Sequence, residues 1–335
     1  MTDRATLADA FLKDAGWGTA LKRPLAGDAS NRRYDRLTHP DFGPAVLMDA
    51  PPEKGEDVRP FTRIARLLLE QGFSAPEIYA EDTDNGFLLL EDLGDDLYAR
   101  VLADQPALEP LLYEAAVDLL AELHQSPAPE DLPAYDSAMM APLADLAVEW
   151  YAPTAGTKTA LSEVLAPLLD QYAPGGSALV MRDYHAENLL WLPDRDGLAR
   201  VGLLDFQDAM RGHPGYDLVS FLQDARRDVD PTLRDQMLDR YIDRTGVEGP
   251  AFRAACAVLS AQRNLRIFGV FARLCLRDSK AHYVDFLPRV WAHLMTDLSH
   301  PALAPLAKTV AKLLPEPTPE IQADLKARCA SLQTR

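Results

Sequence analysis

Residues 178–209 read ALVMRDYHAENLLWLPDRDGLARVGLLDFQDA, and this stretch decides what the chain around it must do. Two short apolar runs, Ala178–Met181 and Val201–Leu204, lead into the aspartates Asp183 and Asp205. A short apolar run that leads into acidic residues is typical of a strand that delivers carboxylates to a site at its end. We therefore expect both aspartates to serve one site.

Asn188 adds an amide to these two carboxylates, five residues after Asp183. Mg²⁺ prefers oxygen ligands and is usually held by one or two carboxylates together with phosphate oxygens. Phosphoryl transfer needs one carboxylate to orient or deprotonate the attacking hydroxyl, and an amide and a second carboxylate to hold Mg²⁺ against the phosphates. Asp183, Asn188 and Asp205 fill these roles in chain order. On the pattern alone, the alternative stays open that Asp183 and Asn188 cap turns and that Asp205 is a solvated strand end.

The periodicity of the chain changes after about its first hundred residues. The early part contains several strand-like runs and one clear helix, Phe61–Glu70, whose apolar residues have helical spacing. Later residues follow a helical pattern almost to the end, as in Ala251–Asp278. The sequence thus predicts a small α+β unit followed by a larger, mainly helical one. The predicted domains are residues 1–95 and residues 96–335, the second of which carries the segment 178–217.

Composition limits the classes of partner. The chain has 335 residues, of which 47% are hydrophobic, and a net charge of −17, which argues against a nucleic-acid partner and against anionic membranes. Neither a signal peptide nor an apolar run long enough to cross a bilayer is recognisable. Cys256, Cys275 and Cys329 lack the spacing of a zinc site or a disulfide framework. We expect a soluble cytoplasmic protein without an obligatory protein partner.

Several motifs together resemble one known family, the aminoglycoside phosphotransferase-like kinases of small molecules, which share the protein-kinase fold. The resemblance covers most of the chain, and its two central motifs, RDYHAENLLWL and GLLDFQDA, are the most specific. Within the family, the chain looks most like bacterial kinases that phosphorylate the anomeric hydroxyl of N-acetylmuramate and N-acetylglucosamine in cell-wall recycling. The other matching segments are AGDASNRRY, FLLLEDLGD, LLAELH and GHPGYDLV.

The resemblance implies a two-lobed protein-kinase-like α+β fold, with ATP and Mg²⁺ as cofactors and residues 1–95 as the nucleotide-binding lobe. It makes Asp183 the catalytic base, and Asn188 and Asp205 the metal ligands. A small-residue turn that lets backbone N–H groups approach an anion would cover the phosphates, and a hinge would meet adenine through its backbone. The implied nucleotide-binding residues are Gly27, Asp28, Ala29, Ser30 and Asn31 in the turn, and Glu91, Asp92 and Leu93 in the hinge.

Three departures from the family pattern affect this interpretation. Met181 stands where such kinases usually have a histidine, two residues before the base. The strand that usually carries a phosphate-binding lysine reads AVLMDA at residues 45–50 and has none, and the helix that follows has no obvious mid-helix glutamate to pair with one. Either Lys54, Arg32 or Arg33 neutralises the phosphates instead, or the lysine is dispensable.

Four residues are candidates for substrate binding, each with a plainer alternative. Asp208 could place a sugar hydroxyl or form a turn, and His185 could touch substrate or only pack. Arg263, beside Asn264, could hold the substrate's carboxylate or hydroxyls. Arg263 also belongs to a basic stripe with Arg266, Arg273 and Arg277 on one helical arc, for which ion pairing with the many acidic residues is the alternative.

The sequence therefore favours an ATP-dependent kinase of the anomeric hydroxyl of N-acetylmuramate, N-acetylglucosamine or both, acting on a small-molecule amino sugar. A kinase of another small alcohol, such as an aminoglycoside, choline or homoserine, is the second interpretation. A nucleotide-binding pseudokinase is the third. The missing lysine favours the pseudokinase slightly, whereas the intact set Asp183, Asn188 and Asp205 opposes it.

Overall fold

The computed structural model describes residues 3–25, 31–153 and 160–332. The chain forms two compact units, and each is built from two separate segments. The first unit comprises Met1–Ala115 and Ala186–Asp208, and the second comprises Ala116–His185 and Ala209–Arg335. The lobe boundary predicted after residue 95 stays a prediction, because this division groups residues by proximity and not by role.

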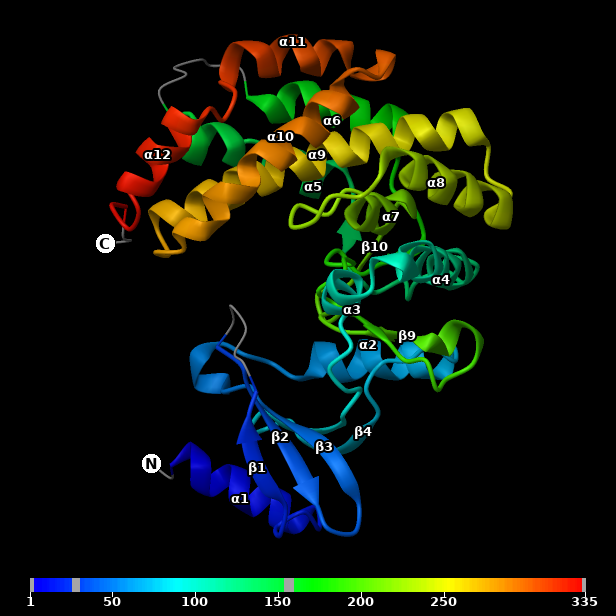
Figure 1. Ribbon diagram of the computed structural model, residues 1–335, viewed down its shortest axis with the longest axis vertical. Coiled ribbons are helices and arrows are strands. Elements are labelled where there is room, and N and C mark those ends of the chain that lie inside the picture. Colours follow the sequence, from blue (N-terminus) through cyan, green and yellow to red (C-terminus); the bar gives the residue numbers. More distant parts are fainter. Residues whose placement is uncertain (1–2, 26–30, 154–159, 333–335) are drawn as a thin grey trace. The chain divides into compact units, whose positions relative to one another are not determined.

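The first unit is built on a five-stranded antiparallel sheet with the order β1-β2-β3-β5-β4 (Figure 1). Because side chains alternate between the two faces of a strand, each strand of this sheet contributes to two environments. The strands are β1 (Leu21–Pro24), β2 (Arg33–His39), β3 (Gly43–Asp49), β4 (Ile78–Asp82) and β5 (Phe87–Glu91).

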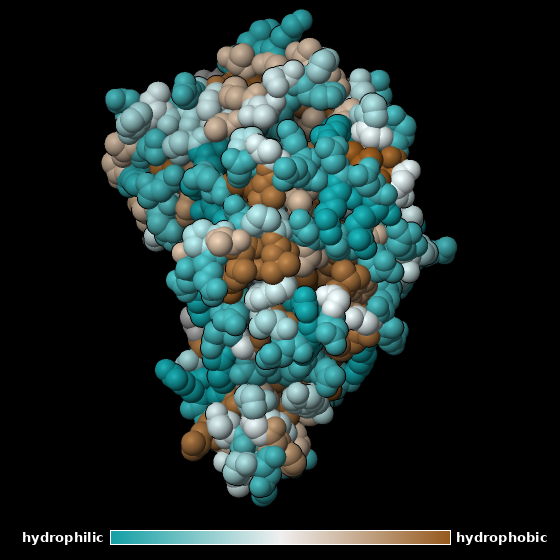
Figure 2. All heavy atoms as spheres, turned by 45° about the vertical axis from the view of Figure 1, so that its right-hand side comes forward, coloured by the Kyte–Doolittle hydropathy of each residue, from teal (hydrophilic) through white to brown (hydrophobic). Residues whose placement is uncertain are grey.

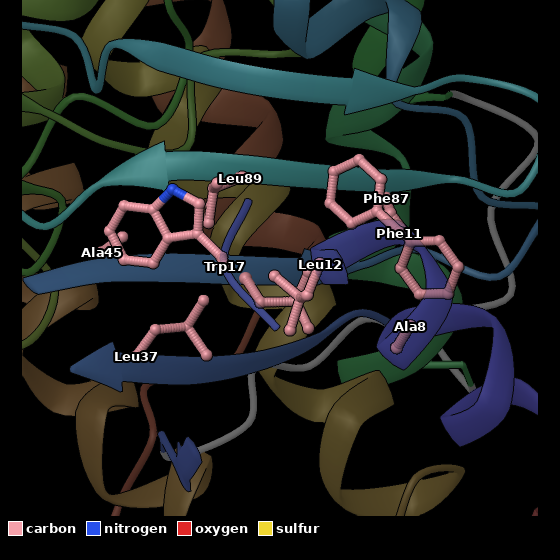
Figure 3. Packing of buried hydrophobic residues seen from close by; sticks show 9 residues of the cluster. Ala8, Phe11, Leu12, Trp17, Leu37, Ala45, Phe87 and Leu89 are labelled. Carbon is pink, nitrogen blue, oxygen red and sulfur yellow. The ribbon is translucent and has the colours of Figure 1, made fainter. Parts of the chain in front are cut away.

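One face of the sheet is covered by the N-terminal helix α1 (Arg4–Asp14). Figure 3 shows Phe11, Leu12 and Trp17 lying against side chains that alternate along the central strands. The rings of Phe11 and Phe87 stack with their centroids 5.7 Å apart. The sheet residues of this core are Leu37, Ala45, Leu47, Phe87 and Leu89. Their neighbours in the strands, including Val46, Met48 and Leu90, therefore face the other side.

A short hairpin from later in the chain completes the first unit. Its strands, β8 (Leu189–Trp191) and β9 (Val201–Leu203), pair antiparallel, and β9 lies within the apolar run that leads into Asp205. Bridges from Ser74 to Gly202 and from Leu97 to Leu190 attach it to the earlier segment. Gly202 is required by close packing, since a Cβ there would lie 2.9 Å from the Leu190 Cβ. The remaining elements of this unit are η1 (Pro52–Lys54), α2 (Arg59–Glu70), α3 (Tyr98–Asp104), η2 (Pro106–Leu108) and η4 (Gly197–Arg200).

The second unit is mainly helical, with one small sheet of order β6-β10-β7 (Figure 1). Helix α4 (Glu109–Leu123) begins in the first unit and ends in the second. The strands are β6 (Ala134–Tyr135), β7 (Ala178–Val180) and β10 (Met210–Gly212). The helices are α5 (Ser137–Ala144), η3 (Ala147–Tyr151), α6 (Leu161–Tyr172), α7 (Gly215–Leu222), α8 (Pro231–Thr245), α9 (Gly249–Leu276), η5 (Ala281–Phe286), α10 (Leu287–Leu298), η6 (Pro301–Leu303), α11 (Ala304–Leu313) and α12 (Pro319–Ala327).

Helix α9 is the core element of the second unit and contacts α5, α6, α7 and α10. The sequence predicts it over Ala251–Asp278, within two residues at either end of the observed helix. A π-helical turn, η3, crosses α9 at Gly269. A Cβ at this glycine would lie 2.2 Å from the backbone carbon of Leu146, so only glycine permits so close an approach.

The surface is largely hydrophilic, as expected for a chain with a net charge of −17. Hydrophilic residues dominate the face shown in Figure 2, and the large apolar side chains with the greatest exposure, Leu21 and Phe42, are 77% and 62% exposed. Across the described ranges, none of the helices combines the length and the apolar character that a bilayer crossing requires.

Candidate active site

The segment that follows β7 is fixed by one buried carboxylate. Asp217, on α7, accepts hydrogen bonds from the backbone N–H groups of Met181 at 2.6 Å and Arg182 at 2.8 Å. Burial raises the pKa of Asp217 to about 7, although these two N–H donors oppose the shift. Arg182 has a φ of 72°, a left-handed conformation that a residue with a side chain adopts only when its surroundings impose it. The Asp217 contacts therefore set the backbone that presents Asp183.

Asp183 lies in a strongly charged part of the second unit. Its carboxylate interacts electrostatically with Arg263 and Arg266 of α9. His185 is 7% exposed, and burial lowers the pKa of its imidazole to about 4, which Asp224 and Asp183 partly offset. At neutral pH His185 is thus uncharged, and the arginines supply the positive charge beside Asp183.

The hairpin of the first unit brings the two predicted metal ligands together. Asn188 immediately precedes β8, and its amide Nδ2 lies 3.3 Å from Oδ2 of Asp205. The backbone also joins the two segments, because the N–H of Leu204 donates to the carbonyl of Asn188 at 3.0 Å. Gln207 donates to Oδ1 of Asp205 at 2.6 Å. Asp205 itself has a φ of 58°, so the turn that carries it is also in a left-handed conformation.

Phe206 anchors this turn. Its side chain is buried and its ring stacks on Phe61 of α2 with a centroid distance of 4.9 Å.

A side-chain carboxylate beside an amide suits a hard cation that prefers oxygen ligands, such as Mg²⁺. Within the ranges that the structure describes, no three His, Cys, Asp or Glu side chains gather as metal ligands. A metal held by Asn188 and Asp205 would therefore complete its coordination with phosphate or water oxygens.

A pocket of about 290 Å³ lies on the side of the sheet opposite α1, and we call it the sheet pocket. Its walls are mostly apolar, which suits a planar base, and the predicted metal pair and the predicted hinge line it together. All of its lining residues belong to the first unit. They include Tyr34, Arg36, Val46, Met48, Phe61, Leu90, Glu91, Asp92, Leu93, Asn188, Leu190, Leu204 and Asp205.

The side chains of two predicted hinge residues form ion pairs. Arg195 pairs with the Glu91 carboxylate at 2.5 Å, and Arg36 pairs with Asp92 at 2.7 Å. The Glu91 N–H already donates to the carbonyl of Glu77 at 2.8 Å. The role predicted for Glu91, Asp92 and Leu93 remains a prediction, with the side chains of the first two engaged in ion pairs.

The turn that the sequence predicts to cover the phosphates falls only partly within the described residues. Gly27, Asp28, Ala29 and Ser30 lie outside the described residues. Asn31 is exposed, and its backbone N–H donates to Oε1 of Glu56 at 3.1 Å. Oε2 of Glu56 pairs with Nε of Arg32 at 2.9 Å. Glu56 is not among the residues that the sequence singles out, because it precedes α2, whereas the family pattern directs attention to the middle of that helix.

The tentative substrate residues fall into different surroundings. Asp208 is exposed in the turn after β9. Asn264 is 1% exposed, and its amide donates to Gln223 at 2.8 Å and to Asp297 at 2.9 Å within a buried polar network. Arg263 is 6% exposed and donates to the carbonyl of Gln223 at 3.4 Å. The structure thus places Arg263 near Asp183, whereas the amide of Asn264 is engaged inside the unit.

The arginines of the basic stripe on α9 also have different partners. Arg277 pairs with its neighbour Asp278 at 2.7 Å. Arg266 donates to the hydroxyl of Tyr216 at 3.2 Å, and that hydroxyl also receives a hydrogen bond from Tyr135 at 3.1 Å. Over the described part of the chain, neither Arg263 nor Arg266 forms an ion pair with a carboxylate. Ion pairing therefore accounts for Arg277 but not for these two arginines.

Comparison with known proteins gives three findings. Residues 23–256 match the model of a family described as the phosphotransferase enzyme family. A relative from Caulobacter vibrioides named N-acetylmuramate/N-acetylglucosamine kinase is 38% identical, over 95% of this chain and 98% of the relative. A Pseudomonas aeruginosa relative of the same name is 35% identical, over 89% of this chain and 91% of its own length.

Among solved structures, a choline/ethanolamine kinase family protein from Mesorhizobium loti has a TM-score of 0.59 at 16% identity, covering 92% of this chain and 99% of that one. At this identity the likeness concerns the fold alone. It confirms the predicted fold class, a protein-kinase-like α+β fold with a strand-rich part and a larger helical part.

Proposed function

The chain belongs to the phosphotransferase enzyme family, and from this premise we propose that it uses ATP and Mg²⁺ to phosphorylate the anomeric hydroxyl of N-acetylmuramate and N-acetylglucosamine. The substrate class rests on relatives that bear this name and match nearly the whole chain. Membership of the family makes the chain a phosphotransferase, as the sequence predicts. The anomeric position, the metal and the residue roles below are parts of the proposal.

The observation that carries the chemistry is the buried carboxylate of Asp217 beneath the segment that presents Asp183. A base for the acceptor hydroxyl must be held in a fixed position, because proximity and orientation supply much of the rate enhancement in phosphoryl transfer. Two hydrogen bonds from Met181 and Arg182 to one buried carboxylate provide such a support. In the proposed reaction, Asp183 accepts the proton of the sugar hydroxyl. The hydroxyl oxygen bonds to the γ-phosphorus of ATP as the bond between that phosphorus and the bridging oxygen breaks, and ADP leaves.

The nucleotide would occupy the sheet pocket, with its base between the apolar side chains and its ring edge at the backbone of the hinge. Asn188 and Asp205, in the same pocket, would hold Mg²⁺. When bound, the ion neutralises phosphate charge. Since the reaction would consume ATP and an amino sugar released from the cell wall, we place it in the cytoplasm.

Arg263 and Arg266 are proposed to recognise the sugar. N-acetylmuramate carries a lactyl carboxylate that N-acetylglucosamine lacks, and guanidinium groups suit carboxylates because of their paired N–H donors. Both arginines lie close enough to Asp183 for electrostatic interaction. We assign hydroxyl contacts to His185 and Asp208. Asn264 is assigned to the same sugar site, where its buried amide network would support Arg263.

A direct test combines substrate and product analysis. The purified chain would be given ATP and Mg²⁺ with N-acetylmuramate, N-acetylglucosamine, choline, homoserine or an aminoglycoside. We expect turnover on the two amino sugars only, with loss of the reducing end, since phosphate at the anomeric carbon blocks ring opening. A product that keeps its reducing end would refute the anomeric assignment, and turnover on choline alone would refute the sugar assignment.

Variants separate the residue roles. Asp183→Asn should lower kcat by about 100-fold to 10,000-fold, the range for loss of a general base, while ADP affinity stays unchanged. Full turnover in Asp183→Asn would exclude the base role. Arg263→Met and Arg266→Met should raise the KM for N-acetylmuramate about tenfold or more, as expected for loss of a charged hydrogen bond, with little effect on N-acetylglucosamine. Equal losses on both sugars would exclude the carboxylate role.

A further inference from the structure

The part of the sheet pocket that β3 lines carries no charged side chain. On β3, the residues that face it are Val46 and Met48, and neither carries a charge. A site that takes ATP, as in the proposed function on which this inference rests, needs a cation near the β- and γ-phosphates. The position at which related kinases carry a lysine is therefore apolar here, and the cation must come from elsewhere.

The strand register shows at which end of the sheet pocket to look for it. Ala45 of β3 pairs with Glu91, so this end of β3 lies beside the hinge. Going away from the hinge, Arg36 pairs with Val46 and then Tyr34 pairs with Met48. The base end thus lies at Val46, and the phosphates extend past Met48. Continuing along β2 in the same direction from Tyr34, the next residue on the same face is Arg32.

Four cations are candidates: Arg32, Arg33, Arg36 and Lys54. Arg36 faces the sheet pocket but lies at the hinge end, where Asp92 and Asp95 each pair with it at 2.7 Å. Lys54 is exposed. Arg33 pairs in register with Asp49, and the alternation that turns Leu37 towards α1 turns Arg33 towards the same side. These three are excluded by position or by exposure.

Arg32 has the required surroundings. Its side chain is 13% exposed, and its Nε pairs at 2.9 Å with Glu56, whose side chain is 14% exposed. It also interacts with Tyr34, which lines the sheet pocket. An arginine that is largely buried and paired with a carboxylate is restricted to few conformations, and its planar fork of donors suits phosphate oxygens.

We infer that Arg32 is the phosphate-binding cation of this site and that Glu56 is its positioning residue. Together they take the place of the lysine–glutamate pair of protein kinases. The cation stands at the residue before β2 instead of on β3, and the carboxylate stands in the segment before α2 instead of on that helix. Met48 then has an apolar role as part of the wall beside the sugar and phosphates of the nucleotide.

Nucleotide binding tests the assignment independently of turnover. Titration calorimetry would compare adenosine, which has no phosphate, with ADP, each without metal. Arg32→Met should weaken ADP binding about tenfold to 100-fold, the range for a charged hydrogen bond, and leave adenosine binding within twofold. Arg33→Met removes the same charge from the opposite face of the sheet and should leave both affinities unchanged.

Two further variants keep the test decisive. In the Arg32→Met background, Met48→Lys should restore much of the ADP affinity, because it returns the cation to the strand that usually carries it. Glu56→Gln should weaken ADP less than Arg32→Met does, and Glu56→Asp should recover part of that loss. If thermal melting of Arg32→Met shows no cooperative unfolding transition, Arg32→Gln replaces it in the binding experiments.

Unchanged ADP binding in a folded Arg32 variant, or equal losses of ADP and adenosine, would overturn the inference. Failure of the wild-type chain to bind ADP at all would instead overturn the proposed function. The two failures are therefore distinguishable.

Discussion

Replacing Asp217 with asparagine tests how the second unit fixes the position of Asp183. The native carboxylate accepts from Met181 at 2.6 Å and from Arg182 at 2.8 Å and is completely buried. Asparagine has one carbonyl oxygen, and its NH₂ group would face the other backbone N–H. One buried donor would then lose its acceptor, at a cost of about 1–3 kcal/mol.

This cost sets the size of the expected effect. Since about 1.4 kcal/mol corresponds to a factor of ten in rate, a displacement of the Asp183 segment that costs the full amount lowers kcat by about fivefold to 140-fold. ADP affinity should stay within twofold, because the sheet pocket is lined only by residues of the first unit. Steady-state kinetics, calorimetry and thermal melting would measure the three quantities on the same preparation.

The control is Asp297→Asn, which removes another buried carboxylate from the same unit. Asp297 bonds with Gln223 and Ser260 at 2.8 Å each, so its loss should lower the melting temperature comparably with a smaller effect on kcat. A folded Asp217→Asn variant with kcat within twofold of wild type would refute the reasoning. Parallel losses of kcat and ADP affinity would also refute it, because they would indicate damage to the whole chain.

Acidity gives a second readout of the same contact. Burial raises the pKa of Asp217 to about 7 against the opposing hydrogen bonds from Met181 and Arg182. Only the ionised carboxylate accepts both N–H groups, so wild-type kcat should rise as pH rises through about 7. This dependence should be absent in Asp217→Asn, which does not titrate; a pH profile of the same shape in both proteins would assign the dependence to another group.

Three other changes have expected outcomes. Gly269→Ala would place a Cβ 2.2 Å from the backbone carbon of Leu146 and should lower the free energy of unfolding by about 1–3 kcal/mol or more, whereas Gly249→Ala, where the nearest contact is 3.7 Å, should change it little; equal urea midpoints would contradict this. Burial raises the pKa of Asp297 to about 7, opposed by Gln223, Ser260 and Asn264, so protonation stabilises the fold at pH values below the ordinary range of the carboxyl pKa, and this contribution disappears as pH rises through about 7. The melting-temperature advantage of wild type over Asp297→Asn should therefore shrink from pH 5 to pH 8, and an advantage that grows would contradict the sign. Asp205→Asn should raise the Mg²⁺ concentration needed for half-maximal turnover about tenfold or more, as for loss of a charged ligand, without changing metal-free ADP affinity, and an unchanged Mg²⁺ requirement would exclude a ligand role.

The sequence was most informative where local pattern and local chemistry coincide. The runs before Asp183 and Asp205 form strands, and the hairpin brings Asn188 beside Asp205. Both features depend on residues close together in the chain, so periodicity and spacing are sufficient to predict them. The 3.3 Å contact between Asn188 and Asp205 brings the two side chains together, and their role as metal ligands stays a prediction.

Contacts between distant residues were not predictable in the same way. Glu56 pairs with Arg32 across 24 positions of sequence, and nothing in the local pattern of either residue indicates the other. On α9, a helical arc groups Arg263, Arg266 and Arg277, but their partners come from other elements. Only the packed structure separates the ion-paired Arg277 from the two arginines near Asp183.

The route of the chain through the two units has a consequence for biosynthesis. Because the first unit takes its last segment from Ala186–Asp208, a ribosome must release the chain through Asp208 before that unit has all of its parts. Until then the sheet lacks the hairpin bridged through Ser74 and Leu97, and the apolar face around Val46 and Met48 lacks the part of its cover that Leu190 and Leu204 supply. We expect a chaperone that binds nascent chains to recognise this face during the interval, and a truncation at Ala115 to yield an aggregating fragment.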